Sequence, residues 1–248
     1  MDITFKSNNA LVIDNVLSRE EFDAIKLYLQ FESYSFVHES EWNKSWRLWD
    51  GHPVSSETYI TKSSKNITVS FNNKNAENSG ISLISNKILE WQDIIRVWQN
   101  NKKSWDYFSS TTYLYPQGSG LGWHEDNNQY LGAYIYYAHP EWKPSWGGEL
   151  CLFDQSGFDN SGYSENISAM SKKSIEMSKI KNGDIGPEFG WSLRERNISE
   201  SDGIGTFIYP KPNRLILIKP TTTHSIKKVE LSAGDNMRCS ITGFFAKS

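Results

Sequence analysis

The hydrophobic and polar positions in the first part of the chain repeat with a helical period. A short apolar run at 11–17 leads into Ser18 and Glu21, the spacing of a capping box, in which each side chain accepts a hydrogen bond from the backbone N–H of the other residue. Apolar residues then recur every three or four positions as far as Gln30, and the same period returns over 81–100. The pattern therefore predicts two amphipathic helices.

The period shortens after Trp105. Short segments rich in Val, Ile, Thr, Tyr and Phe alternate with clusters of Gly, Pro, Asn and Asp, which is typical of an antiparallel sandwich or barrel. These segments are 111–116, 131–138, 148–153, 206–209, 214–219, 224–230 and 237–246. We expect the N-terminal helices to pack against the outer face of one sheet.

A chain of 248 residues has the length of a single β-rich domain. Residues 1–110 would form a helical support region and residues 111–248 a β core. A polar insertion at 155–209, with a short helix expected near 168–179, is longer than the connections of a compact sheet. Its length is that of a lid or binding loop.

Charge and composition limit the classes of molecule that the protein is expected to bind. The chain carries 26 basic and 29 acidic residues without a long block of like charge, which argues against a nucleic-acid or membrane partner. Its apolar runs are too short to span a bilayer, its start lacks the apolar core of a signal peptide, and two cysteines are too few for a disulfide framework. We expect a soluble cytoplasmic protein, and the sequence does not determine its oligomeric state. Its 10 Trp, 12 Tyr and 12 Phe can build a core or line a pocket.

Two histidines and an aspartate suggest a metal site. His124 and Asp126 are two positions apart, and on a strand they would face the same side. A second strand carries His224, and two His plus one carboxylate with open positions is the ligand set of non-haem Fe(II) oxygenases. Taken alone, the pair also fits a polar surface strand, and His224 also fits a structural histidine.

Arg238 stands in the apolar segment 237–245, where an unpaired guanidinium would be costly. It needs a carboxylate partner, which could be an internal Asp or Glu or the acid group of a ligand bound bidentately. Together with the metal set, Arg238 favours a site that binds a metal and an organic acid.

The segments around these residues resemble those of the prolyl 4-hydroxylase-like 2-oxoglutarate/Fe(II) dioxygenases. The motifs that carry the resemblance are 113–127 with its Tyr-Pro and His-x-Asp, the Ile-Tyr-Tyr of 135–137, the Trp-Gly-Gly-Glu-Leu of 146–150, 212–218, His224, and 238–242. They occur in the family's order and, with their surroundings, cover a little over a third of the chain.

The resemblance implies a mainly β fold, a double-stranded β-helix of the cupin-like jelly-roll type with helices on one face. It implies that His124, Asp126 and His224 bind Fe(II) and form the catalytic set. Arg238 would hold the distal carboxylate of the co-substrate 2-oxoglutarate.

Three further residues enter through the resemblance alone. Tyr115 matches a family tyrosine near the active site, Tyr137 matches one whose hydroxyl reaches 2-oxoglutarate, and Thr242 would assist. The implied reaction uses O2, yields succinate and CO2, and hydroxylates a C–H bond, with ascorbate as a stimulant. Because Asp126 keeps the carboxylate that halogenating relatives lack, hydroxylation is favoured over chlorination, while desaturation and cyclisation stay open.

The substrate is not determined by the motifs. The interval from His224 to Arg238 is longer than in the oxygen-sensing prolyl hydroxylases, and the 155–209 insertion exceeds a minimal core. Three functions remain: a hydroxylase of an amino acid or other small metabolite, a peptidyl or protein prolyl hydroxylase, and a non-catalytic jelly-roll binding module. Candidate pocket residues are Trp42, Trp46, Arg47, Trp49, His52, Trp142, Trp146, Trp191, Arg194 and Arg196.

Overall fold

The computed structural model describes residues 1–37, 50–64, 74–99, 104–127, 129–153, 198–199 and 203–248. The helix expected near 168–179 and most of the 155–209 insertion lie outside these ranges. So do seven of the pocket candidates, namely Trp42, Trp46, Arg47, Trp49, Trp191, Arg194 and Arg196.

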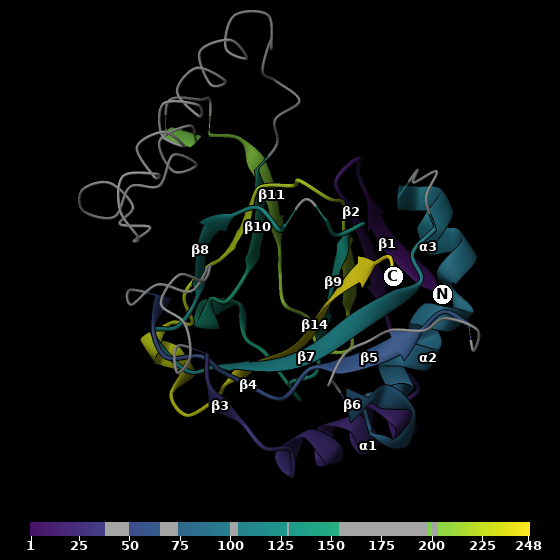
Figure 1. Ribbon diagram of the computed structural model, residues 1–248. Helices are drawn as coiled ribbons and strands as arrows, with labels where there is room; N and C mark the ends of the chain where they lie inside the picture. Colours follow the sequence, from purple (N-terminus) through teal and green to yellow (C-terminus); the bar gives the residue numbers. More distant parts are fainter. Residues whose placement is uncertain (38–49, 65–73, 100–103, 128, 154–197, 200–202) are drawn as a thin grey trace, which may run out of the picture.

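In the described residues, two sheets that are antiparallel except for one strand pair form the body of the protein (Figure 1). The larger follows the order β1 (Asp2–Lys6), β2 (Ala10–Asp14), β12 (Leu215–Ile218), β9 (Ala133–Tyr137), β14 (Arg238–Ala246), β7 (Tyr107–Tyr115), β4 (Val54–Ser55) and β3 (Ser35–Phe36). From β7 it branches to β5 (Tyr59–Lys62), which pairs in parallel with β6 (Lys74–Asn75). The smaller follows the order β11 (Gly205–Ile208), β10 (Leu150–Phe153), β13 (His224–Ile226) and β8 (Leu121–His124). The predicted antiparallel sandwich or barrel is confirmed.

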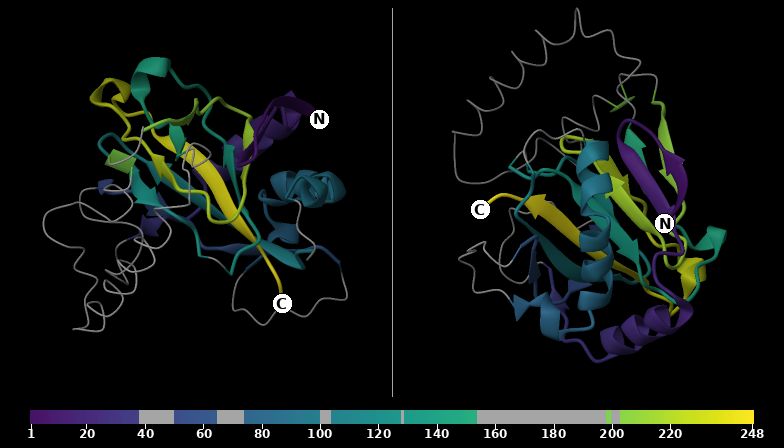
Figure 2. Two further views of the ribbon diagram at one scale, coloured as in Figure 1. Left: turned by 90° about the horizontal axis from the view of Figure 1, so that it is seen from above. Right: turned by 90° about the vertical axis from the view of Figure 1, so that its right-hand side faces the viewer.

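Three α-helices lie on the face of the larger sheet that is turned away from the smaller sheet (Figures 1 and 2). They are α1 (Arg19–Gln30), α2 (Ser82–Glu90) and α3 (Gln92–Gln99), and short 3-10 turns occur at Ala76–Asn78, Pro144–Trp146 and Leu231–Ala233. The capping box before α1 is present, since Ser18 Oγ accepts from the Glu21 N–H and the Glu21 carboxylate accepts from the Ser18 N–H. None of the described helices is long and apolar enough to cross a membrane.

The second predicted helix is divided in two. Residues 81–100 were expected to form one helix, but Trp91 takes a backbone φ of −100° and ψ of 10°, so α2 ends and α3 begins there. The Trp91 ring is buried in the core between the helices and the sheet. The apolar period therefore predicted which side chains pack inward, but not the change of helix axis.

The core consists of two apolar clusters, one on each face of the larger sheet. Along β9, Tyr134 and Tyr136 face the helices, whereas Ile135 and Tyr137 face the smaller sheet. Side chains of a strand alternate between faces, and a strand buried on both faces has a nearly continuous apolar sequence. The space between the sheets, which holds the second cluster, also receives the polar residues of the candidate site.

An ion pair joins β2 to the segment before β12. Asp14 at the end of β2 is buried and accepts hydrogen bonds from Arg214 Nε at 2.6 Å and from Lys211 Nζ at 3.0 Å. Burial by itself raises the pKa of Asp14, but the hydrogen bonds from Arg214 and Lys211 together lower it below its usual value. The ionised carboxylate therefore stabilises the folded state.

We expect Asp14→Asn to lower the free energy of unfolding at neutral pH by about 2 kcal/mol, the size of hydrogen bonds to a charged group. Because the folded-state pKa of Asp14 lies below the unfolded value, its contribution is complete above about pH 4 and is lost as the pH falls through the folded-state pKa. Urea titrations between about pH 2 and 7 should give a shallower pH dependence for the variant than for the wild type. Parallel profiles would contradict this role of Asp14.

Candidate metal and co-substrate site

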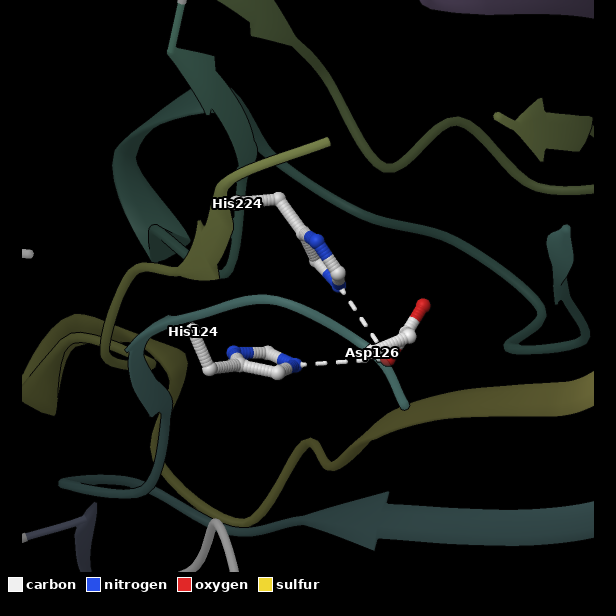
Figure 3. Close-up of side chains that lie close together, drawn as sticks. All are labelled: His124, Asp126 and His224. Carbon is white, nitrogen blue, oxygen red and sulfur yellow. Dashed lines mark ion pairs between the residues drawn. The ribbon is translucent and has the colours of Figure 1, made fainter. Parts of the chain in front are cut away.

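The three predicted metal ligands converge at the edge of the smaller sheet (Figure 3). His124 is the last residue of β8, His224 is the first residue of β13, and the antiparallel register places them opposite each other. Asp126 lies two residues beyond the end of β8. One potential ligand atom from each side chain lies within 4.8 Å of the other two.

Asp126 does not lie on the same strand as His124. We expected His124 and Asp126 to share a face because they are two residues apart on one strand, but β8 ends at His124. The chain that leaves the strand still directs Asp126 toward both imidazoles. Its Oδ1 is 3.8 Å from Nε2 of His124 and 4.0 Å from Nε2 of His224.

Each imidazole is oriented by the backbone two residues before it. His124 Nδ1 lies 2.8 Å from the carbonyl oxygen of Gly122, and His224 Nδ1 lies 2.8 Å from that of Thr222. Because a carbonyl oxygen only accepts hydrogen bonds, each Nδ1 carries a proton, and in the neutral imidazole Nε2 then has the lone pair. That lone pair is what a metal ligand requires, and a hydrogen bond to the other ring nitrogen is the usual support of a metal-bound histidine.

The aspartate is largely enclosed. Its side chain is 16% exposed, and burial raises the pKa of the Asp126 carboxyl, while the neighbouring His224 lowers it to a smaller extent. Two imidazole nitrogens and one carboxylate oxygen on one side of a common point form a donor set suited to Fe(II) with open positions. The residues present therefore fit such an ion.

Arg238, the first residue of β14, is fully buried. Its guanidinium carbon lies 4.8 Å from the ring centroids of both Tyr115 and Tyr137. Nη1 donates to Ser240 Oγ and Nη2 to the Tyr137 hydroxyl, each at 3.3 Å, while Nε has no hydrogen-bond partner among the described residues. No described carboxylate pairs with Arg238, so within the described ranges the alternative of an internal ion pair finds no support.

Gly148 provides room for the Arg238 side chain. It has a φ of +73°, and a Cβ added there would lie 2.8 Å from Cδ of Arg238. Trp142 lies on the same side, since its ring would be 3.5 Å from that Cβ. The Gly-Gly turn of 147–148 therefore leaves the space that the arginine fills.

Tyr113 and Tyr115 lie side by side on the face of β7 that Arg238 contacts. The rings of Tyr113 and Tyr115 are 6.4 Å apart, and Tyr115 lies beside Arg238. Burial raises the pKa of Tyr113 to about 12, with smaller contributions from Tyr130 and from the charge of Asp126. His224 stands opposite Leu152 in the ladder of the smaller sheet, and Leu152 and Tyr115 belong to the same cluster between the sheets, so the two ends face one interior.

Thr242 is on the same face of β14 as Arg238 and Ser240, but farther along the strand, opposite Thr111 and Ile135. Its assisting role stays a prediction. Ser240, Tyr113 and Gly148 were not singled out from the sequence. Alternation along β14 and β7 would have assigned the first two to the face of Arg238 and Tyr115.

The tryptophans predicted as pocket residues belong in part to the core. Trp142 and Trp146 are 6% and 5% exposed and pack in the cluster between the sheets. Their rings are in edge-to-face contact. Trp142 also borders Gly148, on the side where Arg238 lies. His52, the remaining described candidate, is exposed, and its ring packs edge-to-face on Phe36.

A family model described as the 2OG-Fe(II) oxygenase superfamily matches residues 110–246, more than half of the chain. The chain belongs to this superfamily. Its members depend on Fe(II) and 2-oxoglutarate, and the His-Asp-His group described above lies within the matched region. The protein is therefore an oxygenase with the predicted jelly-roll fold. No curated protein sequence matches it.

Solved structures of the superfamily share the fold of this oxygenase at low sequence identity. A prolyl-4-hydroxylase from Pseudomonas putida is 13% identical with a TM-score of 0.52, and the match covers 96% of this chain and 93% of that one. An oxidoreductase of the 2OG-Fe(II) oxygenase family from Burkholderia pseudomallei is 10% identical with a TM-score of 0.54, and the match covers 97% of this chain and 86% of that one. The third structure is a prolyl hydroxylase from Trichoplax adhaerens in complex with a peptide fragment of the hypoxia inducible factor oxygen degradation domain. It is 14% identical with a TM-score of 0.52, and the match covers 97% of this chain and 84% of that one.

We expect a divalent cation that binds at this site to stabilise the folded protein. With Co(II) as a redox-stable probe at about 100 times its Kd, binding to the folded state adds about 2.7 kcal/mol, which raises Tm by roughly 5–10 °C. Asp126→Ala removes one ligand, so its Tm should respond far less to Co(II). Differential scanning calorimetry with and without Co(II) measures both. An equal Tm increase in the two proteins would place the cation elsewhere.

Proposed function

We propose that this oxygenase hydroxylates an unactivated C–H bond of an amino acid or other small metabolite, with succinate and CO2 as co-products. In this proposal His124, Asp126 and His224 hold Fe(II), and Arg238 holds the distal carboxylate of 2-oxoglutarate. The observation that carries it is the fully buried Arg238, without a described carboxylate partner, facing the same interior as the His-Asp-His group.

Each residue has a defined task. Nδ1–H bonds to backbone carbonyls keep Nε2 of both histidines available, and Asp126 supplies the anionic ligand. Arg238, fixed between two tyrosine rings, offers its guanidinium to a carboxylate, and the Tyr137 hydroxyl stands at 3.3 Å from Nη2, where it can bond the same group. Bound iron, O2 and 2-oxoglutarate would supply the oxidising power, with ascorbate as a stimulant.

Asp126 favours hydroxylation over halogenation. Its carboxylate would take the ligand position that a halide would need on the metal. The other outcomes of C–H oxidation, desaturation and ring closure, need the same ligands and differ in how the substrate is held.

A prolyl residue of a peptide is the second candidate substrate. Two of the similar structures are prolyl hydroxylases, and the one from Trichoplax adhaerens holds a peptide. Incubating the enzyme with free amino acids and with proline-containing peptides, followed by mass spectrometry for one added oxygen atom, separates the two candidates. The third alternative, a non-catalytic binding module, has no support from membership in an oxygenase superfamily.

Anaerobic addition of Fe(II) and 2-oxoglutarate should produce a weak visible charge-transfer band, because the co-substrate binds the metal directly. Asp126→Ala should weaken or abolish the band. Absorption spectroscopy under saturating conditions measures it. Absence of the band in the wild-type protein would count against the proposal as a whole.

Arg238→Met should weaken 2-oxoglutarate binding by about 30-fold or more, since truncating one partner of a buried charged pair costs about 2–5 kcal/mol. Gly148→Ala should also weaken it, because the new Cβ displaces Arg238. Gly118→Ala is the matched control: Gly118 has a φ of +78° but no atom within 4 Å of an added Cβ. Titration of the charge-transfer band with 2-oxoglutarate gives the affinities. Equal losses in both glycine variants would attribute the effect to backbone strain.

A further inference from the structure

A side-chain hydrogen bond joins the two segments that carry the metal ligands. Thr223 Oγ1 donates to Glu125 Oε1 at 2.8 Å. Glu125 stands between His124 and Asp126 in the chain, and Thr223 directly precedes His224. The bond therefore connects immediate neighbours of all three predicted ligands.

The orienting bonds of the histidines do not make this connection. Each imidazole is bonded to a carbonyl of its own segment, at Gly122 or at Thr222. The register between β13 and β8 is also irregular, with a shift between His224 and Ile226. The ladder is thus irregular next to the metal end, and the Thr223–Glu125 bond is a further contact between the two segments there.

Thr223 is a well-anchored donor. The residue is 4% exposed. Its backbone carbonyl oxygen accepts a hydrogen bond from the Phe153 N–H at 2.9 Å, which holds Thr223 against β10. The acceptor is a carboxylate oxygen, and a hydrogen bond to a charged group is stronger than one between neutral groups. Glu125 is thereby held against the smaller sheet, and the backbone on both sides of it is held too.

We propose that Thr223 and Glu125 are a positioning pair that sets the distance between the His124–Asp126 segment and His224, and so tunes metal affinity. Neither residue supplies a ligand atom. The inference rests on the proposed function, since it takes the three residues to be the metal site. A supporting hydrogen bond around a metal site typically changes the affinity by about 10–100-fold.

The test measures Co(II) affinity of the apoprotein by isothermal titration calorimetry, with visible Co(II) absorption as a report on the ligand geometry. Thr223→Val keeps the side-chain shape but removes the donor, and its Kd should rise by about 10–100-fold with an altered spectrum. Thr223→Ser keeps the hydroxyl and should bind as the wild type does.

Thr61→Val serves as the matched control. Thr61 is also buried and also donates one side-chain hydrogen bond, to Ser85 Oγ at 3.1 Å, but it lies in β5. Its loss should lower Tm without changing the Co(II) affinity. If Thr223→Val acted only through stability, the two variants would behave alike.

Glu125→Gln completes a double-mutant cycle. Its own loss of affinity includes the effect of removing a charge near the cation, so the coupling with Thr223→Val is the informative quantity. Coupled losses support the pair, and additive losses overturn it. A Thr223→Val protein that binds Co(II) like the wild type, or a Thr223→Ser protein as weak as Thr223→Val, also overturns it.

Failure of the underlying proposal would look different. If the wild type and Asp126→Ala bind Co(II) equally, the three residues are not the metal site. If Asp126→Ala loses binding while Thr223→Val does not, the metal site stands and only the positioning pair is wrong.

Discussion

The antiparallel pairing of β13 with β8 is the constraint on which the candidate site depends. It places His224 opposite His124, although 100 positions of sequence separate them. Asp126 follows β8 closely enough to reach both imidazoles. Without this pairing the three side chains would not lie close together, because the local sequence around His224 does not determine its position relative to the His-x-Asp segment.

The larger sheet provides the second half of the site by burying a charge. Arg238 begins a strand whose outward neighbours Cys239 and Ile241 pack under the helices, so the guanidinium is directed into the space between the sheets. There it is partly compensated by two tyrosine rings and two hydroxyl groups. A buried cation with neutral partners is costly to maintain for stability alone, but it is well suited to an acidic ligand.

The larger sheet thus carries the helix-covered core on one face and the candidate site on the other. The helix-covered face holds the larger apolar cluster, with Phe108, Tyr134 and Phe245 in mutual ring contact. The other face, toward the smaller sheet, combines apolar packing with the polar side chains of the site. A rigid sheet buried on both sides is a suitable support for ligands that must keep their relative positions.

The local sequence determined a large part of this picture. The capping box and the apolar period gave α1, the strand segments after Trp105 gave most of the β core, and the residue types at 124, 126, 224 and 238 indicated a metal and an acid. It did not determine the break at Trp91 or the end of β8 before Asp126. It also did not determine the exposed strand β1 or the two-residue strands β3, β4 and β6, which are too short to show a period.

Only the tertiary structure decided what these residues have for neighbours. That Arg238 lies between Tyr115 and Tyr137, that Gly148 leaves room for it, and that Thr223 bonds Glu125 all depend on strand register between distant segments. Periodicity is a property of neighbouring residues along the chain, so it can assign a side chain to a face. Which side chain stands opposite is set by the pairing of strands, and that information is not local.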